Sequence, residues 1–499
     1  MRTKDVVVVG GGVAGLVAAR DMAAAGMRVS LIEAAHALGG RVQQATLAGL
    51  PVELGAEAFA TRGGAVETLL DELDLVDATV RPERTPAWVL TAQSAHPLPI
   101  SGALGIPARP LFTRKTIGLA AALWVATEPW RPRSAHAPEA SVADVARARI
   151  GARATTALIA PVVEGVYSAS PEHLRFDDQT ALASAYARTG SLVRAAREVR
   201  SAHLAAGGAV ASLTGGMSRL VERLVTELRR LGVTIHTGSP VTELASAQGA
   251  ACDNAPDQPG AAPASAGWRV HWEGGNCSAS AVVLALAPRE VDRLLNGPDK
   301  AAAELLPETA PETTADTSGE TAVETVALVV DSPALGGAAG RPAPRGTGAL
   351  IRPDHPHIAA KALTHATAKW AWLRDAAPAG RHVLRLSYGA RGRPPATAGL
   401  SDQQAALLAL RDASEILGLP LDAAQLVAHA RARWSIPARA GLPAVPPGLH
   451  CTGEAYAGTG LASVVPHARS VASDVIRASA SSTSSTSPNS VAQGARSTP

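Results

Sequence analysis

A glycine-rich turn near the start of the chain constrains the fold more than any other feature. The apolar run at 6–9 is typical of a buried parallel strand, and it leads directly into the motif GGGVAG at 10–15. A helical pattern follows at 16–25, and a second strand-like run at 28–32 ends at Glu33. This order predicts a Rossmann-like α/β domain that binds a dinucleotide.

Each glycine of this turn has a physical role in binding a pyrophosphate. Gly10 allows the tight turn, Gly12 lets the backbone approach the phosphates, and Gly15 lets helix and strand pack closely. The helix N-terminus supplies free N–H groups and the positive end of a dipole. Glu33 is placed to accept hydrogen bonds from the adenosine ribose, and its charge disfavours NADP. The alternative, a glycine-rich loop beside a coincidental strand, does not account for the full context.

Two further segments distinguish a flavin from a nicotinamide cofactor. Gly39-Gly40-Arg41 follows Glu33 closely, and VELGAE comes later, at 52–57. They resemble the second diphosphate contact and the flavin-approaching loop of the FAD-dependent amine oxidase and protoporphyrinogen oxidase superfamily. The resemblance implies that FAD is the cofactor. The residues that it implies as FAD contacts in these segments are Gly40, Arg41, Gly55, Ala56 and Glu57.

The resemblance covers most of the chain, about 1–245 and 268–477. Segments such as PVVEGVY at 161–167 and GTGALI at 346–351, and later Lys369-Trp370, are similar to bacterial protoporphyrinogen and coproporphyrinogen III oxidases. Near the C-terminus, GEAYAGTGL resembles the last FAD motif of the family, in which a glycine turn starts a helix beneath the flavin ring. The resemblance implies that Val241 lies near the adenine. The remaining FAD contacts that it implies are Gly453, Glu454, Gly460 and Leu461.

The fold class implied is α/β, a two-domain FAD-binding Rossmann-like fold with an intertwined α+β substrate-binding domain. Two low-complexity stretches are expected to be disordered: 245–267, an insertion in a hairpin, and 478–499, a Ser/Thr-rich tail. The FAD-binding domain is expected at 1–60, 206–300 and 431–477. The substrate-binding domain is expected at 61–205 for its helical part and at 325–430 for its sheet part.

Composition and charge narrow the partners and the compartment. The chain has 46 Lys and Arg against 43 Asp and Glu, a net charge of +3 that gives no support for nucleic-acid binding. Cys252, Cys277 and Cys451 lack metal-ligand spacing, so no metal site is expected and a reducing compartment is favoured. The longest apolar window, 117–126, is too short to cross a membrane and is expected to form a buried helix. We therefore expect a cytoplasmic enzyme without an integral membrane segment.

The substrate region is basic, and the chain shows no convincing set of catalytic side chains. Residues 81–200 hold 15 Lys or Arg and 9 Asp or Glu, which suits a substrate with several propionates. Arg62 lies just past the flavin-approaching loop, where a guanidinium could pair with a carboxylate of the substrate. No Ser/His/Asp or Cys/His arrangement is found, so the redox chemistry is expected to belong to the cofactor and no catalytic residue is predicted.

The resemblance implies an oxidase of haem biosynthesis that oxidises a porphyrinogen with dioxygen as acceptor. The basic region and the missing membrane segment favour coproporphyrinogen III, with four propionates, over protoporphyrinogen IX, with two. Two alternatives stay open. One is a flavin amine oxidase or carotenoid-desaturase-like oxidoreductase. The other is a non-catalytic flavoprotein scaffold that binds haem precursors, suggested by the segment at 435–450, which is shorter than is usual in the family.

Overall fold

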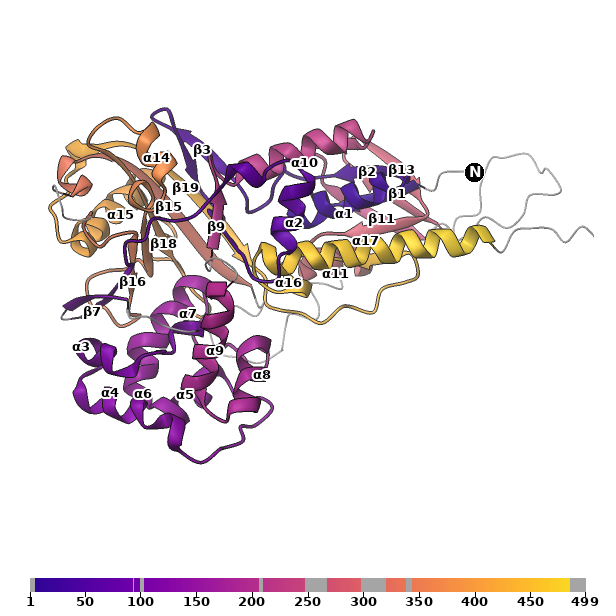
Figure 1. Ribbon diagram of the computed structural model, residues 1–499. Helices are drawn as coiled ribbons and strands as arrows, with labels where there is room; N and C mark the ends of the chain where they lie inside the picture. Colours follow the sequence, from indigo (N-terminus) through magenta and orange to yellow (C-terminus); the bar gives the residue numbers. More distant parts are fainter. Residues whose placement is uncertain are drawn as a thin grey trace, which may run out of the picture.

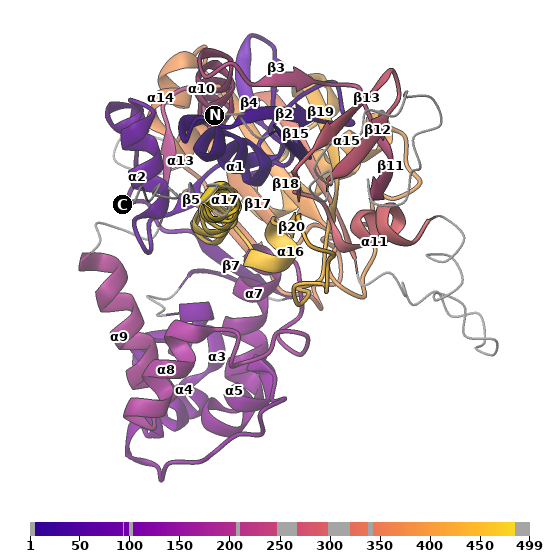
Figure 2. The ribbon, with the colours of Figure 1, turned by 90° about the vertical axis from the view of Figure 1, so that its right-hand side faces the viewer.

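The chain forms two units built on β-sheets and a third part made of helices (Figure 1). The structure, a computed structural model, describes residues 5–92, 94–98, 103–205, 210–246, 267–297, 320–337 and 343–484. Figure 2, turned by 90°, shows the helical part projecting from one side of the two sheet units. The α/β fold class expected from the sequence is confirmed.

The first unit is built on a five-stranded sheet in which every neighbouring pair is parallel. An all-parallel sheet is covered on both faces, so its strands are apolar throughout rather than alternating. Strands β1 and β14 show this, with the sequences DVVVV and AVVL. In sheet order the strands are β10 (Thr234–His236), β2 (Arg28–Ile32), β1 (Asp5–Val9), β14 (Ala281–Leu284) and β20 (Leu449–Cys451).

The two faces of this sheet pack against different layers. Val6 and Val8 belong to a core with three helices, whereas Val7 and Val9 belong to a second core with a small antiparallel sheet. The helices are α1 (Val13–Ala24), α10 (Ser218–Arg230) and α17 (Leu461–Ser484), with α2 (Ala65–Glu72) at their edge. On the other face lie β11 (Val241–Ser246), β12 (Trp268–Trp272), β13 (Gly275–Ala279) and α11 (Pro288–Asn296).

The second unit is a seven-stranded mixed sheet. One face of β15 (Thr321–Asp331) packs under α15 (Asp402–Leu417), and the other packs on the segment around Trp370. Short helices α13 (Ala366–Lys369) and α14 (Ala371–Ala376) carry that segment. In sheet order the strands are β19 (Leu426–Ile436), β15 (Thr321–Asp331), β18 (Arg381–Tyr388), β17 (Ala362–His365), β16 (Gly348–Ile351), β7 (Trp88–Thr91) and β8 (Ser94–Pro97).

The helical part has its own apolar core between residues 103 and 199. It is joined to the sheet units through β9 (Val210–Leu213), which pairs with β5 (Phe59–Ala60) and β6 (Thr79–Val80). A small hairpin, β3 (Gln44–Leu47) with β4 (Leu50–Glu53), leads toward the second unit. The helices are α3 (Arg114–Ile117), α4 (Leu119–Ala126), α5 (Val142–Ile150), α6 (Ala152–Ala154), α7 (Ala160–Tyr167), α8 (Thr180–Thr189) and α9 (Leu192–Ala205).

Several segment boundaries differ from those expected. The segment 61–205 is not only helical, because β7 and β8 extend the seven-stranded sheet. Strand β19 runs to Ile436, so the return to the first unit starts after 436 rather than at 431. Helix α17 continues to Ser484, so 478–484 is helical and not part of a tail. The rest of the expected tail, 485–499, and the insertion at 247–266 lie outside the described residues.

The apolar window at 117–126 is not the single buried helix that we expected. Gly118 adopts φ +84° and splits it into α3 and α4. Ala122 and Val125 of α4 are buried, but Leu119, Leu123 and Trp124 on its other face are exposed. Hydrophobicity alone could not predict this, because burial depends on which neighbours cover a helix face.

The helical part depends on a buried ion pair. Glu128 is fully buried, pairs with Arg149 at 2.7 Å, and accepts hydrogen bonds from the backbone N–H groups of Leu192 and Val193 at the start of α9. It thereby balances a buried guanidinium and caps a helix.

We predict that Glu128→Ala lowers the free energy of unfolding by about 3–5 kcal/mol, because Arg149 is left as an uncompensated buried charge. Urea denaturation followed by circular dichroism measures the change. Glu139→Ala is the control, since Glu139 is largely exposed in its pair with Arg175 and should change stability by less than about 1 kcal/mol. Equal effects of the two substitutions would contradict the assignment.

Candidate functional site

The glycine turn between β1 and α1 is sterically required. A Cβ at Gly15 would lie 1.9 Å from the carbonyl oxygen of Gly10, and a Cβ at Gly10 would lie 2.5 Å from that of Ala285. Gly10 also adopts φ +105°, a region that favours glycine. At Gly12, in contrast, the nearest atom to a Cβ is the Cα of Gly40 at 3.9 Å. Gly10 and Gly15 therefore close the turn, while the backbone at Gly12 borders open space.

The second glycine pair lies directly against this turn. The Gly39 N–H donates to the carbonyl oxygen of Gly11 at 2.8 Å, and Gly39 forms a parallel bridge with Gly12. Both Gly39 and Gly40 have positive φ, +111° and +58°. Two loops that are separate in sequence thus meet through their backbones at the N-terminus of α1. Exposed N–H groups and a helix dipole at such a place suit a diphosphate.

Glu33 is held at the end of β2, beside the glycine turn. Its carboxylate accepts hydrogen bonds from the N–H of Gly11 at 2.5 Å and of Ala35 at 2.8 Å. The carbonyl of Glu33 accepts from Ser239 N–H, which brings the start of β11 and the buried Val241 next to this corner. The residues expected to hold the adenosine therefore lie together, although the contact of Val241 with an adenine stays a prediction.

Three motifs that are far apart in the sequence converge at Arg41. Its guanidinium contacts the Glu454 carboxylate, and its carbonyl accepts from Ala56 N–H at 2.9 Å. A Cβ at Gly55 would lie 1.8 Å from the same carbonyl oxygen, so only glycine fits there. Burial lowers the pKa of Arg41 to about 10, which leaves the side chain charged at neutral pH. A half-buried cation beside the glycine turns fits an anionic cofactor.

The glycine turn before α17 lies directly before that helix, as expected. Gly458 and Gly460 have φ +90° and +91°, and Leu461 starts the helix. No described atom lies within 4 Å of a Cβ built at Gly453, Gly458 or Gly460. A side chain at Gly460 would therefore strain the backbone rather than collide with the described protein, and a contact with the flavin stays a prediction.

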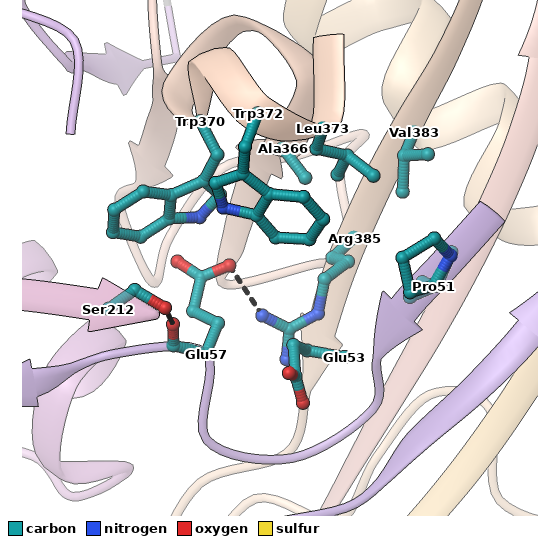
Figure 3. A pocket seen from close by; sticks show the side chains of 11 residues that line it. Pro51, Glu53, Glu57, Ser212, Ala366, Trp370, Trp372, Leu373, Val383 and Arg385 are labelled. Atoms are coloured by element: carbon teal, nitrogen blue, oxygen red, sulfur yellow. Dashed lines mark hydrogen bonds and ion pairs between the residues drawn. The ribbon is translucent and has the colours of Figure 1, made fainter. Parts of the chain in front are cut away.

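Glu57 forms the centre of a buried ion-pair cluster (Figure 3). Its carboxylate pairs with Lys369 and with Arg385, the latter at 2.6 Å, and Arg385 also donates to the carbonyl of Gly55 at 2.6 Å. Burial alone raises the pKa of Glu57, but Lys369 and Arg385 outweigh it and hold the value at about 2. The carboxylate of Glu57 thus ties the expected flavin loop to the seven-stranded sheet. The sequence did not predict this use of its side chain.

A second carboxylate beside this cluster, that of Glu53, is buried with one oxygen atom that has no hydrogen-bond partner in the described protein. Glu53 lines a cavity of about 10 Å³ with Glu57, Arg385 and Trp372 (Figure 3), enough for one water molecule. Its carboxylate accepts a hydrogen bond from Met217 N–H at 2.5 Å, but its Oε2 has no partner in the described protein. Burial raises the pKa of Glu53 to about 7.

The raised pKa of Glu53 makes stability depend on pH. Between pH 4.5 and about 7 the folded state keeps a proton that the unfolded state releases, so stability falls as pH rises through this window. We predict that the free energy of unfolding of Glu53→Gln, measured relative to that of the wild type, increases by about 3 kcal/mol as the pH is raised from 4.5 to 8. Glu222→Gln, at an exposed glutamate of α10, is the control. A stability difference that does not change with pH would overturn the assignment.

A large cleft opens between the C-terminal glycine turn and the helical part. It has a volume of about 620 Å³, with Gly458 and Thr459 on one wall. Apolar side chains from the helical part, among them Leu104, Val162 and Leu182, form the opposite wall. The arginines that line the cleft are Arg62, Arg175, Arg391 and Arg439.

These arginines differ in how strongly the protein itself engages them. Arg62 makes one long hydrogen bond to Ser463, at 3.5 Å, and Arg439 is 3.8 Å from Asp178. Arg175 pairs with the exposed Glu139. Within the part of the chain that the structure describes, the Arg391 guanidinium has no hydrogen-bond or ion-pair partner. Arg62 lies where the sequence placed it, whereas Arg175, Arg391 and Arg439 were not predicted.

Two of the unpredicted arginines, Arg391 and Arg439, occupy equivalent places after two strands, which the sequence alone did not reveal. Arg391 and Arg439 follow the ends of β18 and β19. Both strands are antiparallel to β15, so they run in the same direction and end at the same edge of the sheet. Without the strand order, the sequence does not show that these two arginines lie at the same edge of the sheet.

The described residues contain no group of three or more His, Cys, Asp or Glu that could hold a metal ion. The same residues include no helix that is long and apolar enough to span a bilayer.

The chain belongs to the family of flavin-containing amine oxidoreductases, whose model matches residues 13–495. Together with the glycine turns and Arg41, this defines a flavin-dependent oxidoreductase, and the expected resemblance is confirmed.

Within that class, the chain is similar to coproporphyrinogen III oxidases. It is 29% identical to that of Mycobacterium tuberculosis over 435 residues, which covers 85% of this chain and 84% of the relative. It is 24% identical to that of Bacillus subtilis over 502 residues, covering 95% and 98%. The crystal structure of the Exiguobacterium sp. 255-15 protein described as "Putative protoporphyrinogen oxidase" has the same fold, with a TM-score of 0.74, 23% identity and coverage of 96% and 100%.

Proposed function

We propose that this protein is an FAD-dependent oxidase that converts coproporphyrinogen III to coproporphyrin III with dioxygen as the acceptor. The observation that carries the proposal is the cleft of about 620 Å³ that is lined by four arginines and adjoins the C-terminal glycine turn. Relatives named coproporphyrinogen III oxidase along most of the chain support the same substrate.

FAD fits the residues present. Gly12 and Gly40 leave a backbone cradle open to a diphosphate, and Glu33 offers a carboxylate to the adenosine ribose. Arg41 adds a half-buried positive charge. The N-terminus of α17 follows the glycine turn, and its dipole would favour negative charge on a reduced flavin. The flavin supplies the redox chemistry, and the protein supplies binding and orientation.

The balance of the reaction sets what the cleft has to do. Converting a porphyrinogen to a porphyrin removes six hydrogens in three two-electron steps, and each step reduces one dioxygen to hydrogen peroxide. The macrocycle is apolar and its propionates are anionic. Apolar side chains such as Val162 and Leu182 suit the ring, and guanidiniums suit carboxylates because they can donate two parallel hydrogen bonds. Coproporphyrinogen III, with four propionates, can pair with more of these arginines than protoporphyrinogen IX, with two.

Anaerobic mixing tests the proposal directly. A purified protein that releases FAD on denaturation, and whose flavin absorbance is bleached by coproporphyrinogen III, is the expected enzyme. If protoporphyrinogen IX bleaches the flavin and coproporphyrinogen III does not, the substrate is wrong. A yellow protein that neither porphyrinogen bleaches would be a flavoprotein without this activity.

We predict that Glu33→Ala weakens FAD binding about ten- to a hundred-fold, because a charge-assisted acceptor worth about 1.5–3 kcal/mol is lost. Fluorescence titration of the apoprotein with FAD measures the change, and Glu33→Gln should fall between the two. The melting temperature of each apoprotein is the control, since Glu33 also accepts from Gly11 and Ala35. Unchanged FAD affinity in Glu33→Ala would exclude the ribose contact.

We predict that Arg391→Ala and Arg62→Ala each raise the KM for coproporphyrinogen about ten-fold or more and leave FAD content unchanged, because each loses a charged hydrogen bond to substrate. Lysine at either position should restore only part of the affinity, since an ammonium lacks the planar fork. Arg433→Ala is the matched control, because Arg433 lies on β19 and pairs with Asp402 outside the cleft. Indistinguishable KM values in all variants would show that neither arginine binds the substrate.

A further inference from the structure

A buried lysine lies beside the turn that carries Arg391. Lys361, the residue before β17, is only 3% exposed. Its ammonium donates to the side-chain oxygen of Ser168 at 2.6 Å and to the carbonyl oxygen of Gly389 at 2.6 Å, and both acceptors are neutral. Burial lowers the pKa of Lys361 to about 7, although the nearby Glu164 carboxylate raises it. A buried cation costs free energy that an apolar side chain of the same length would not, so packing alone does not explain a lysine here.

The two acceptors belong to segments that meet at the cleft. Ser168 caps the end of α7 and Gly389 follows β18, and both have positive φ, +53° and +82°. A Cβ at Gly389 would lie 2.4 Å from the carbonyl oxygen of Ala322, so the backbone is closely packed there. The Arg391 N–H donates to the Ser168 carbonyl oxygen at 2.9 Å. Lys361 therefore links the same two segments that the Arg391 backbone joins directly.

A second contact anchors this turn on α7. The turn at 389–393 is closed by two backbone hydrogen bonds between its second and last residues, at 2.9 and 2.8 Å. The Arg393 guanidinium pairs at 2.6 Å with Glu164 of α7, whose carboxylate is largely buried. Figure 1 shows α7 between the helical part and β16. Because α7 also supplies Val162 to the apolar wall of the cleft, these contacts fix Arg391 relative to that wall.

The Arg391 guanidinium lines the cleft without side-chain support. Within the described residues it has no hydrogen-bond or ion-pair partner, so its position depends on the backbone that carries it. Small shifts of the turn change how a planar guanidinium meets a carboxylate, because the paired hydrogen bonds require a fixed geometry. We propose that Lys361 is a positioning residue for substrate binding, which holds the turn on α7 so that Arg391 pairs with a propionate. This inference rests on the proposed function and names a residue that sets its specificity for carboxylates.

Titration of the full-length holoprotein with coproporphyrin III, followed by porphyrin fluorescence, tests this role. The porphyrin carries the same four propionates as the proposed substrate. Lys361→Met keeps the length of the side chain but removes its charge and its donors, and it should weaken binding about five-fold or more. The KM for coproporphyrinogen III should rise similarly, with kcat and FAD content unchanged. Lys115→Met, at an exposed lysine of α3, is the matched control and should bind like the wild type.

Two further comparisons separate positioning from a general loss of structure. Ser168→Ala removes one of the two acceptors but keeps the carbonyl that accepts from the Arg391 N–H, so it should weaken binding less than Lys361→Met does. In a double-mutant cycle, Lys361→Met should have little further effect in an Arg391→Ala background, because the guanidinium that it positions is already gone. In an Arg62→Ala background it should keep its full effect, since Arg62 contacts Ser463 of α17 instead.

The outcomes distinguish failure of this role from failure of the proposed function. Lys361→Met and Ser168→Ala proteins that bind coproporphyrin III like the wild type, while Arg391→Ala binds it more weakly, would overturn the positioning role alone. Equal effects of Lys361→Met in the Arg391→Ala and Arg62→Ala backgrounds would do the same, and so would an Arg391→Ala protein that binds like the wild type. A wild type that neither binds coproporphyrin III nor is bleached by coproporphyrinogen III would overturn the proposed function and this role with it.

Discussion

The carboxylate of Glu57 lies buried between two cations from distant parts of the chain. Lys369 is the last residue of the short helix α13 and Arg385 lies in the middle of β18, so the pairs join the expected flavin loop to the seven-stranded sheet. Arg385 adds a hydrogen bond to Gly55 in the same loop. A buried charge must be compensated, so removing any one member leaves the others in an apolar environment. Together with the apolar packing of Leu50 and Val52 on Trp370, this cluster holds the expected flavin loop against the second unit.

The cleft exists because three separate parts of the chain meet there. The turn before α17 supplies one wall, the helical part supplies the apolar wall, and the edge of the seven-stranded sheet supplies Arg391 and Arg439. The buried pair of Glu128 and Arg149 holds the helical part in shape, and the Glu57 cluster holds the sheet. Under the proposed function, substrate recognition is therefore a property of the assembled units, whereas FAD binding is largely a property of the first unit.

Features that local interactions decide could be predicted from the sequence, whereas features that depend on distant contacts could not. The turn with Gly10 and Gly15 was predicted with its helix and strands because steric rules over some thirty residues decide it. Arg62 was placed at the cleft because it lies only a few residues past the flavin loop. The exposed face of α4 was missed, since the same apolar residues would suit a buried helix. The boundaries at 431 and 478 were wrong because strand β19 and helix α17 continue as long as they have neighbours to pair with or pack on.

The sequence by itself determined the glycine turn beside Glu33, the fold class and the class of flavin-dependent oxidoreductase. Glycines that only a close backbone approach explains, and a carboxylate at the end of the next strand, need no distant partner to be understood. Only the tertiary structure decided the partners of Glu57, which lie 312 and 328 residues away, and the arginines that share the cleft. Strand order and strand direction bring Arg391 and Arg439 to one edge, and both depend on packing across the whole chain rather than on any local pattern.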